Sequence, residues 1–61
     1  MESKRLLTEL EAAHYIGLGR TAARSWLRQI GAVRRFGRAV RYDRFTIDQA
    51  LDAQTAQRVQ G

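Results

Sequence analysis

The sequence predicts one small domain that is mainly α-helical and carries a small β-hairpin. Two stretches with a helical spacing of apolar residues flank a short glycine-containing turn, and a third helical stretch follows later in the chain. Between the second and third stretches, the period changes to that of short strands. With 61 residues the chain is expected to form a single domain, and without cysteine it must be stabilised by aliphatic and aromatic packing.

The first helix is predicted to begin after Thr8 and to run to about Ile16. Thr8 and Glu11 have the spacing of a capping box, in which each side chain accepts a hydrogen bond from the backbone N–H of the other. Leu7 is placed for the hydrophobic staple that often precedes such a box. Gly17 then ends the helix, because glycine adopts the left-handed conformation without a steric penalty.

The second helix is predicted from Arg20 to Ile30, with a glycine directly after it. At about 100° per residue its apolar residues share one face, and Trp26 is expected at the centre of the core rather than stacked on a base. Guanidinium and hydroxyl groups cover the opposite face, from Arg20, Thr21, Arg24, Ser25 and Arg28. Arginines at this spacing repel one another, so a partner that neutralises them would explain the arrangement.

A hairpin is predicted from two β-rich runs, Ala32–Phe36 and Ala39–Tyr42, which a Gly-Arg pair separates. Val33 and Phe36 cannot both lie on one face of a regular strand, so we expect a β-bulge or a twist near the turn. Tyr42 is expected to close the core with its hydroxyl group in water.

The third helix is predicted to start after Asp43, a candidate N-cap, with Ile47 and Leu51 on its apolar face. Residues 52–61 have little to bury, so they are expected to form the fraying end of this helix or a flexible tail. The predicted domain therefore spans residues 1–51.

The charge balance suggests a polyanionic partner. The formal net charge is +5, and residues 20–44 hold eight arginines against the one carboxylate of Asp43. Arginine matches phosphates and guanine edges, and a short basic block between near-neutral flanks is typical of nucleic-acid binding. No apolar run approaches ~20 residues and no signal-peptide core is present, so we expect a soluble intracellular protein without a membrane partner.

The predicted contact between the first two helices favours a helix-turn-helix. Ala12, Ala13 and Ala23 are small enough for two helices to cross closely, and glycine stands in the turn between them. An ordinary αα-hairpin is the alternative. The arginine, threonine and serine face of the second helix favours the DNA-reading motif.

Other patterns favour neither an enzyme nor a metal site. Residues 17–22 match a dinucleotide-binding fingerprint, but they follow a predicted helix instead of a strand. His14 has no second ligand nearby and is expected at the surface, and the carboxylates have helix-cap or surface explanations. We therefore expect no catalytic residue, cofactor, metal or small-molecule ligand.

The chain also resembles a known family over roughly Leu6 to Leu51. The residues that carry the resemblance are Leu7-Thr8, Glu11-Ala12-Ala13, Tyr15-Ile16-Gly17-Leu18-Gly19-Arg20, Trp26-Leu27, Arg35-Phe36-Gly37-Arg38 and Val40-Arg41-Tyr42. Together they resemble the excisionase-type winged helix-turn-helix proteins, relatives of the MerR DNA-binding domain. Gly19 stands where the family usually has Ser, and the third helix lacks the family's usual Glu-Asp-Leu start and later Trp.

The resemblance implies that the second helix enters the major groove of DNA and that the hairpin, as a wing, follows the neighbouring minor groove. On the helix, the residues that would face bases and phosphates are Arg20, Thr21, Arg24, Ser25 and Arg28. On the wing, the corresponding residues are Arg35, Gly37, Arg38 and Arg41.

The function implied by the resemblance is that of a recombination directionality factor. Such a DNA-binding excisionase binds attachment-site DNA, contacts itself on adjacent sites, bends the DNA and promotes the excision of a phage or mobile element by a tyrosine integrase. The expected location is the cytoplasm of a bacterial host, on the nucleoid. Two alternatives stay open, namely a small AlpA-like transcriptional regulator and a protein-interaction adaptor whose basic face meets an acidic partner.

Overall fold

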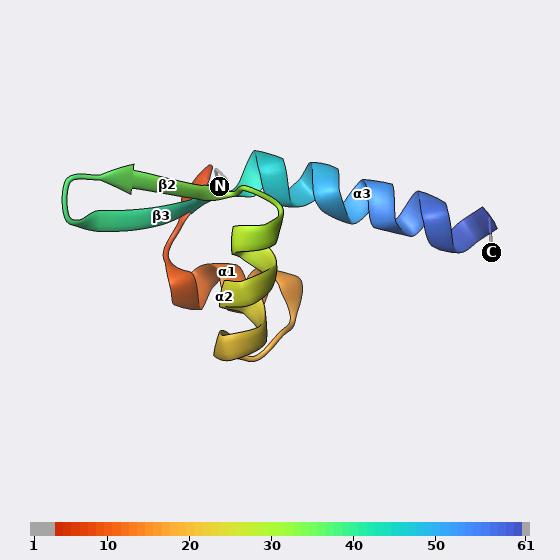
Figure 1. Cartoon of the computed structure of the whole chain (residues 1–61), viewed down its shortest axis with the longest axis horizontal. Coiled ribbons are helices and arrows are strands. Elements are labelled where there is room, and N and C mark those ends of the chain that lie inside the picture. Colours follow the sequence, from red (N-terminus) through yellow and green to blue (C-terminus); the bar gives the residue numbers. More distant parts are fainter. Residues whose placement is uncertain (1–3, 61) are drawn as a thin grey trace.

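A computed structural model describes residues 4–60 of the chain, with side chains to residue 54, as three helices and a three-stranded antiparallel sheet (Figure 1). In chain order the elements are β1 (Leu6–Leu7), α1 (Glu9–Ile16), α2 (Arg20–Gln29), β2 (Val33–Phe36), β3 (Ala39–Asp43) and α3 (Arg44–Gln60). The predicted order of helix, helix, hairpin and helix is confirmed. The short strand β1 before the first helix is an addition to it.

Local hydrogen bonds set both ends of α1, as predicted. The Glu11 backbone N–H donates to Thr8 Oγ1 at 3.2 Å, and the Thr8 N–H donates to Glu11 Oε1 at 2.9 Å. Gly17 ends the helix in the left-handed conformation, with φ at 74°. The otherwise unpaired backbone groups at both ends therefore find partners within a few residues.

Alanines make the close contact between α1 and α2. Ala12, Ala13 and Ala23 are each at most 3% exposed, which confirms the small-residue contact expected from the sequence. At the start of α2, Gly19 occupies the N-cap position and supplies no side-chain hydrogen bond. Packing must therefore stabilise this helix, and Leu27 supplies it from a fully buried position.

The strand order in the sheet is β1-β3-β2, so β3 is the central strand. Gly37 has a positive φ of 62° in the two-residue turn, and the β2–β3 pairing runs without a break from Val33 opposite Tyr42 to Phe36 opposite Ala39. Of the two explanations expected for the positions of Val33 and Phe36, the β-bulge is therefore wrong. Regular alternation places Phe36 on the face opposite Val33, and Phe36 is 53% exposed.

The core lies between the first two helices, the sheet and the start of α3. Its buried apolar residues are Leu7, Ala12, Ala13, Ala23, Leu27, Ala32, Tyr42 and Ile47. Asp43 caps α3 as predicted, because its Oδ1 accepts a hydrogen bond from the Phe45 backbone N–H at 3.3 Å. Ile47 is fully buried and Leu51 packs at the edge of the core, which confirms the predicted apolar face of this helix.

Trp26 does not occupy the centre of the core, contrary to the expectation. It is half-buried beside Leu51, in a hollow also lined by Ile16, Leu18 and Gln54. Because α1 and α2 approach closely, Leu27 fits between them and is fully buried. The larger indole group of Trp26 lies at the edge of the apolar face, where α3 covers it in part.

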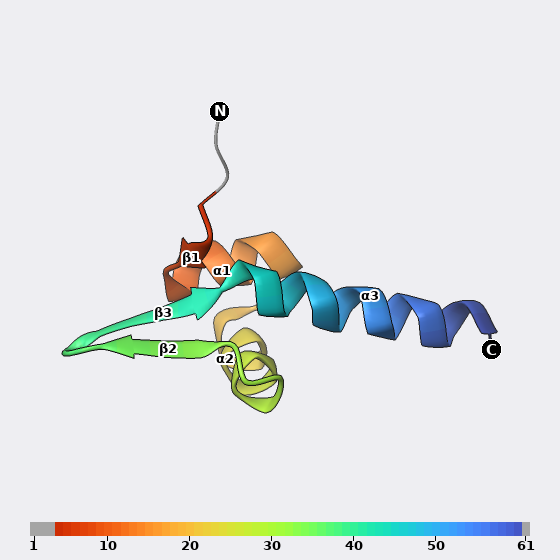
Figure 2. The same cartoon turned by 90° about the horizontal axis from the view of Figure 1, so that it is seen from above.

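Beyond the core, α3 extends away from the hairpin and from the first two helices (Figures 1 and 2). Residues 52–61 were expected to form either the end of this helix or a flexible tail. Their backbone is helical as far as Gln60, and Gly61 lies outside the described residues. No helix within residues 4–60 is long and apolar enough to cross a membrane.

Candidate nucleic-acid interface

The basic face of α2 is exposed along its whole length. Its members are Arg20, Thr21, Arg24, Ser25 and Arg28, and each of them is exposed. They share this face because Ala23 and Leu27, on the opposite side of the helix, are fully buried against the core. The structure therefore brings the predicted helix residues together on one surface. All of them except Arg20 also line a shallow hollow along the helix.

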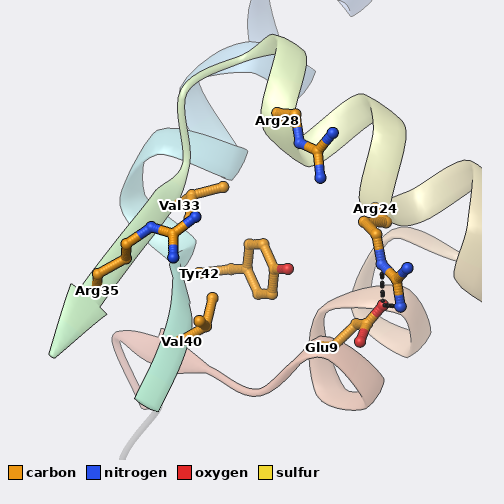
Figure 3. A pocket seen from close by; sticks show the side chains of 7 residues that line it. All are labelled: Glu9, Arg24, Arg28, Val33, Arg35, Val40 and Tyr42. Carbon is orange, nitrogen blue, oxygen red and sulfur yellow. Dashed lines mark hydrogen bonds and ion pairs between the residues drawn. The ribbon is translucent and has the colours of Figure 1, made fainter. Parts of the chain in front are cut away.

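A groove of about 670 Å³ separates α2 from the hairpin (Figure 3). We call it the basic groove, and its lining residues are Glu9, Arg24, Arg28, Val33, Arg35, Val40 and Tyr42. Two arginines enter it from α2 and one from β2, while valine and tyrosine side chains from the hairpin line the space between them. Cationic groups from two separate elements thus meet across an apolar surface.

Strand pairing explains which hairpin residues line the basic groove. Val33 lies opposite Tyr42, and Arg35 lies opposite Val40, so these four side chains share one face of the sheet. Leu7 of β1 pairs with Tyr42 and continues the same face into the core. The regular register therefore places Arg35 on the sheet face that also covers the core. Arg35 lies nearer the hairpin turn, where this face lines the basic groove.

Tyr42 joins the core to the basic groove. The residue is only 6% exposed, and Figure 3 shows its hydroxyl group directed into the groove towards α2. The prediction that its ring closes the core is confirmed. A hydroxyl group in this place supplies a hydrogen-bond donor between the two arginines of α2 and Arg35 of the hairpin.

Glu9 places one carboxylate in this basic surrounding. Its Oε2 accepts a hydrogen bond from Arg24 Nε at 2.8 Å and lies 2.8 Å from Arg24 Nη2. The Glu9 side chain is 24% exposed, whereas that of Arg24 is 56% exposed. The carboxylate therefore lies beside one edge of the guanidinium group and leaves much of that group accessible.

The remaining predicted residues of the hairpin lie outside the basic groove. Gly37 and Arg38 form its exposed turn. Arg41 lies opposite Arg34 on the other face of the sheet, and its Nη1 donates to the Val40 carbonyl group at 2.9 Å. Of the four predicted hairpin residues, only Arg35 is thus brought together with α2.

On that other face, Asp43 is the centre of a cluster of charged residues. It is 2% exposed, its Oδ1 accepts from Arg5 Nε at 2.9 Å, and its Oδ2 accepts from Arg34 Nη2 at 3.3 Å and from Thr46 Oγ1 at 3.0 Å. Arg5 also lies over the Phe45 ring, 5.4 Å from its centroid. The hydrogen bond from Arg5, followed by those from Thr46 and the Phe45 backbone, lowers the pKa of Asp43 to about 2 despite its burial.

Neither acid–arginine contact, that of Glu9 or that of Asp43, was predicted from the sequence. Helix-cap or surface positions were expected for these two carboxylates, which describes part of their role. Glu9 does lie in the first turn of α1, but its partner is 15 residues away, and the Arg5 partner of Asp43 is 38 residues away. For Asp43, the one acid among the eight arginines of residues 20–44, that isolation was a signal of pairing, whereas Glu9 gave none.

Among the described residues, no three of His, Cys, Asp and Glu gather in a way that could hold a metal ion, and His14 is exposed as expected. The arrangement instead offers guanidinium and hydroxyl donors for an extended anion. Comparison with protein-family models, with curated proteins and with solved structures finds no match to this chain, so its function is argued from the α2 face and the basic groove.

Proposed function

We propose that the chain is a winged helix-turn-helix protein that binds duplex DNA. In this proposal α2 lies in the major groove, and the β2–β3 hairpin is the wing that follows the adjacent minor groove. The observation that carries the proposal is the convergence of Arg24 and Arg28 from α2 with Arg35 from β2 on one groove.

The dimensions of DNA agree with this arrangement. The major groove, about 12 Å wide, admits one α-helix, and a sugar-phosphate strand separates it from the minor groove. A protein that uses both grooves must therefore hold that strand between its helix and its wing. The basic groove lies between these two elements and offers the guanidinium groups of Arg28 and Arg35 and the Tyr42 hydroxyl group to phosphate oxygens.

Within this class we propose the role of an excisionase, a recombination directionality factor without chemistry of its own. The resemblance of residues 6–51 to excisionase-type proteins supports this role. So does the small contact area available to one short helix and one hairpin, since single modules of this kind bury ~600–1,000 Å² on DNA. A contact area of this size covers too few base pairs for one molecule to select its site. Self-association on adjacent attachment sites would supply that selectivity, and a tyrosine integrase would be the partner that uses the bent DNA.

Salt dependence is the first test of DNA binding. The predicted DNA-binding residues include six arginines, namely Arg20, Arg24 and Arg28 of α2 and Arg35, Arg38 and Arg41 of the hairpin. If these neutralise about five to six phosphates, log K for duplex DNA should fall with log salt at a slope near −5, at about −0.9 per phosphate. Arg28→Ala should weaken binding, while Lys4→Ala, which removes an exposed charge paired with Glu11, should leave it nearly unchanged. A flat salt dependence would reject DNA binding and favour an adaptor with a protein partner.

A second experiment tests the excisionase role. The protein should occupy adjacent repeats cooperatively, bend DNA in a circular-permutation gel shift, and stimulate integrase-mediated excision while inhibiting integration. Independent binding to a lone promoter site, with straight DNA and unchanged recombination, would instead support the AlpA-like regulator.

A further inference from the structure

Glu9 is the one acidic residue among those that line the basic groove. It comes from the first turn of α1, whereas its partner Arg24 belongs to α2. Both short contacts, from Nε and from Nη2, reach the same carboxylate oxygen, Oε2 (Figure 3). The acid therefore holds the guanidinium group along one of its edges.

The edge that Glu9 occupies leaves the other end of the guanidinium group available. Arginine has five N–H donors, and the contacts with Glu9 use the Nε donor and one on Nη2. The two N–H groups of Nη1 and the second of Nη2 point away from the carboxylate. This end-on pair of nitrogens has the geometry that matches O6 and N7 of guanine.

The other two arginines of the basic groove lack such a partner. Neither Arg28 nor Arg35 forms an ion pair with a carboxylate in the part of the chain whose side chains are described. Arg28 lies one helical turn beyond Arg24 on the same face of α2. On one face of α2, Arg24 is therefore paired with a carboxylate, and Arg28, one turn further along, is not paired with any of the described carboxylates.

We propose that Glu9 is a positioning residue that gives DNA binding its selectivity through Arg24. This inference rests on the proposed function as a DNA-binding protein. Held by Glu9, Arg24 presents its end-on nitrogens to a base edge and is less free to turn towards the nearest phosphate. Arg28 keeps that freedom and contributes mainly to affinity for any sequence.

The physical reason is that Glu9 acts differently on the two kinds of contact. An arginine fixed before binding loses less rotamer freedom when it meets a base edge in the right place. A carboxylate near the DNA backbone also repels phosphates, so it weakens contacts that carry no sequence information. The first effect favours the correct site over random DNA, whereas the second lowers the affinity for both kinds of duplex about equally.

The test compares Glu9→Ala with Asp52→Ala, using the duplex that the wild-type protein selects from a random library and a random-sequence duplex. Asp52 is a matched control because it is an exposed acid on α3, outside the basic groove, and its loss changes the net charge equally. For Glu9→Ala we expect the ratio of the two affinities to fall about tenfold, the order of magnitude of one bidentate base contact. Binding to random DNA should tighten, and its salt slope should become steeper by up to about 0.9.

A background with Arg24→Ala shows whether Glu9 acts through Arg24. There, adding Glu9→Ala should leave the affinity ratio unchanged, while the same addition to Arg28→Ala should still lower it about tenfold. Glu9→Gln keeps the side-chain length and should lower the ratio less, which provides the comparison if the alanine variant is poorly folded by circular dichroism. The Thr8–Glu11 capping box remains in all these variants.

The outcomes separate this inference from the proposed function. If the wild-type protein does not bind duplex DNA, the proposed function fails. If it binds selectively and the Glu9 variants keep the full affinity ratio, only the positioning role is overturned. A loss that persists without Arg24 would also overturn it, because the Glu9 carboxylate would then be contacting a base itself.

Discussion

Replacement of Asp43 by asparagine should remove a pH-dependent part of the stability of this domain. The pKa of this carboxyl group falls from 3.8 to about 2 on folding, mainly because Arg5 donates a hydrogen bond to it. A difference of nearly two pH units corresponds to about 2 kcal/mol of free energy of unfolding. The Arg5 side chain is 69% exposed, so solvent screening reduces the expected contribution to about 1–2 kcal/mol.

The sign of the pH dependence follows from the lowered pKa. A carboxyl group that ionises more readily in the folded state stabilises the fold at every pH above its unfolded pKa, here 3.8. This contribution is lost as the pH falls from about 4 towards 2, where the folded state also takes up the proton. The difference in stability between the wild-type protein and Asp43→Asn should therefore be full at pH 7 and close over that acid range.

Urea unfolding followed by circular dichroism at pH 7, 4 and 3 measures this difference. Asparagine caps helices about as well as aspartate, so Asp43→Asn keeps the cap of α3, while Asp43→Ala should cost about 1 kcal/mol more. Asp52→Asn is the control for net charge and should show no such dependence. Equal stability of Asp43→Asn and the wild-type protein at pH 7, or a difference that stays constant to pH 3, would refute the reasoning.

Four other substitutions test the core, the turn and the groove. Leu27→Ala should cost ~2–5 kcal/mol in thermal or urea unfolding, and more than Trp26→Ala, because Leu27 is fully buried and Trp26 is not. Gly37→Ala should destabilise the domain by about 1 kcal/mol, since an alanine must adopt the positive φ of the hairpin turn. Tyr42→Phe should weaken DNA binding in gel shifts and leave the melting temperature nearly unchanged, and equal affinity would exclude a phosphate contact by its hydroxyl group.

The parts of the fold that follow from neighbouring residues could be predicted from the sequence. The cap at Thr8, the left-handed end at Gly17 and the two-residue turn at Gly37 each depend on interactions across a few positions. The exposed face of α2 could be predicted as well, because helical periodicity separates its arginines from Ala23 and Leu27.

The parts that depend on distant residues could not be predicted. β1 has only two residues, too few for a periodic pattern, and exists because Leu6 and Leu7 pair with the end of β3. The position of Trp26 depended on how closely the alanines let α1 and α2 approach, which residue spacing does not give. The pairing of Glu9 with Arg24 likewise required knowledge of how α1 lies against α2.

Asp43 and the basic groove lie on opposite faces of the small sheet, and the arginines near them differ in their partners. On the face that carries Asp43, Arg5 and Arg34 are neutralised, so their charges stabilise the junction of sheet and α3 and are less available to an anion. On the groove face, Arg28 and Arg35 have no carboxylate partner in residues 4–54, and their repulsion is a cost that a polyanion would relieve. Asp43 thus neutralises the arginines at the junction with α3, while Arg28 and Arg35 keep their positive charge where DNA is proposed to bind.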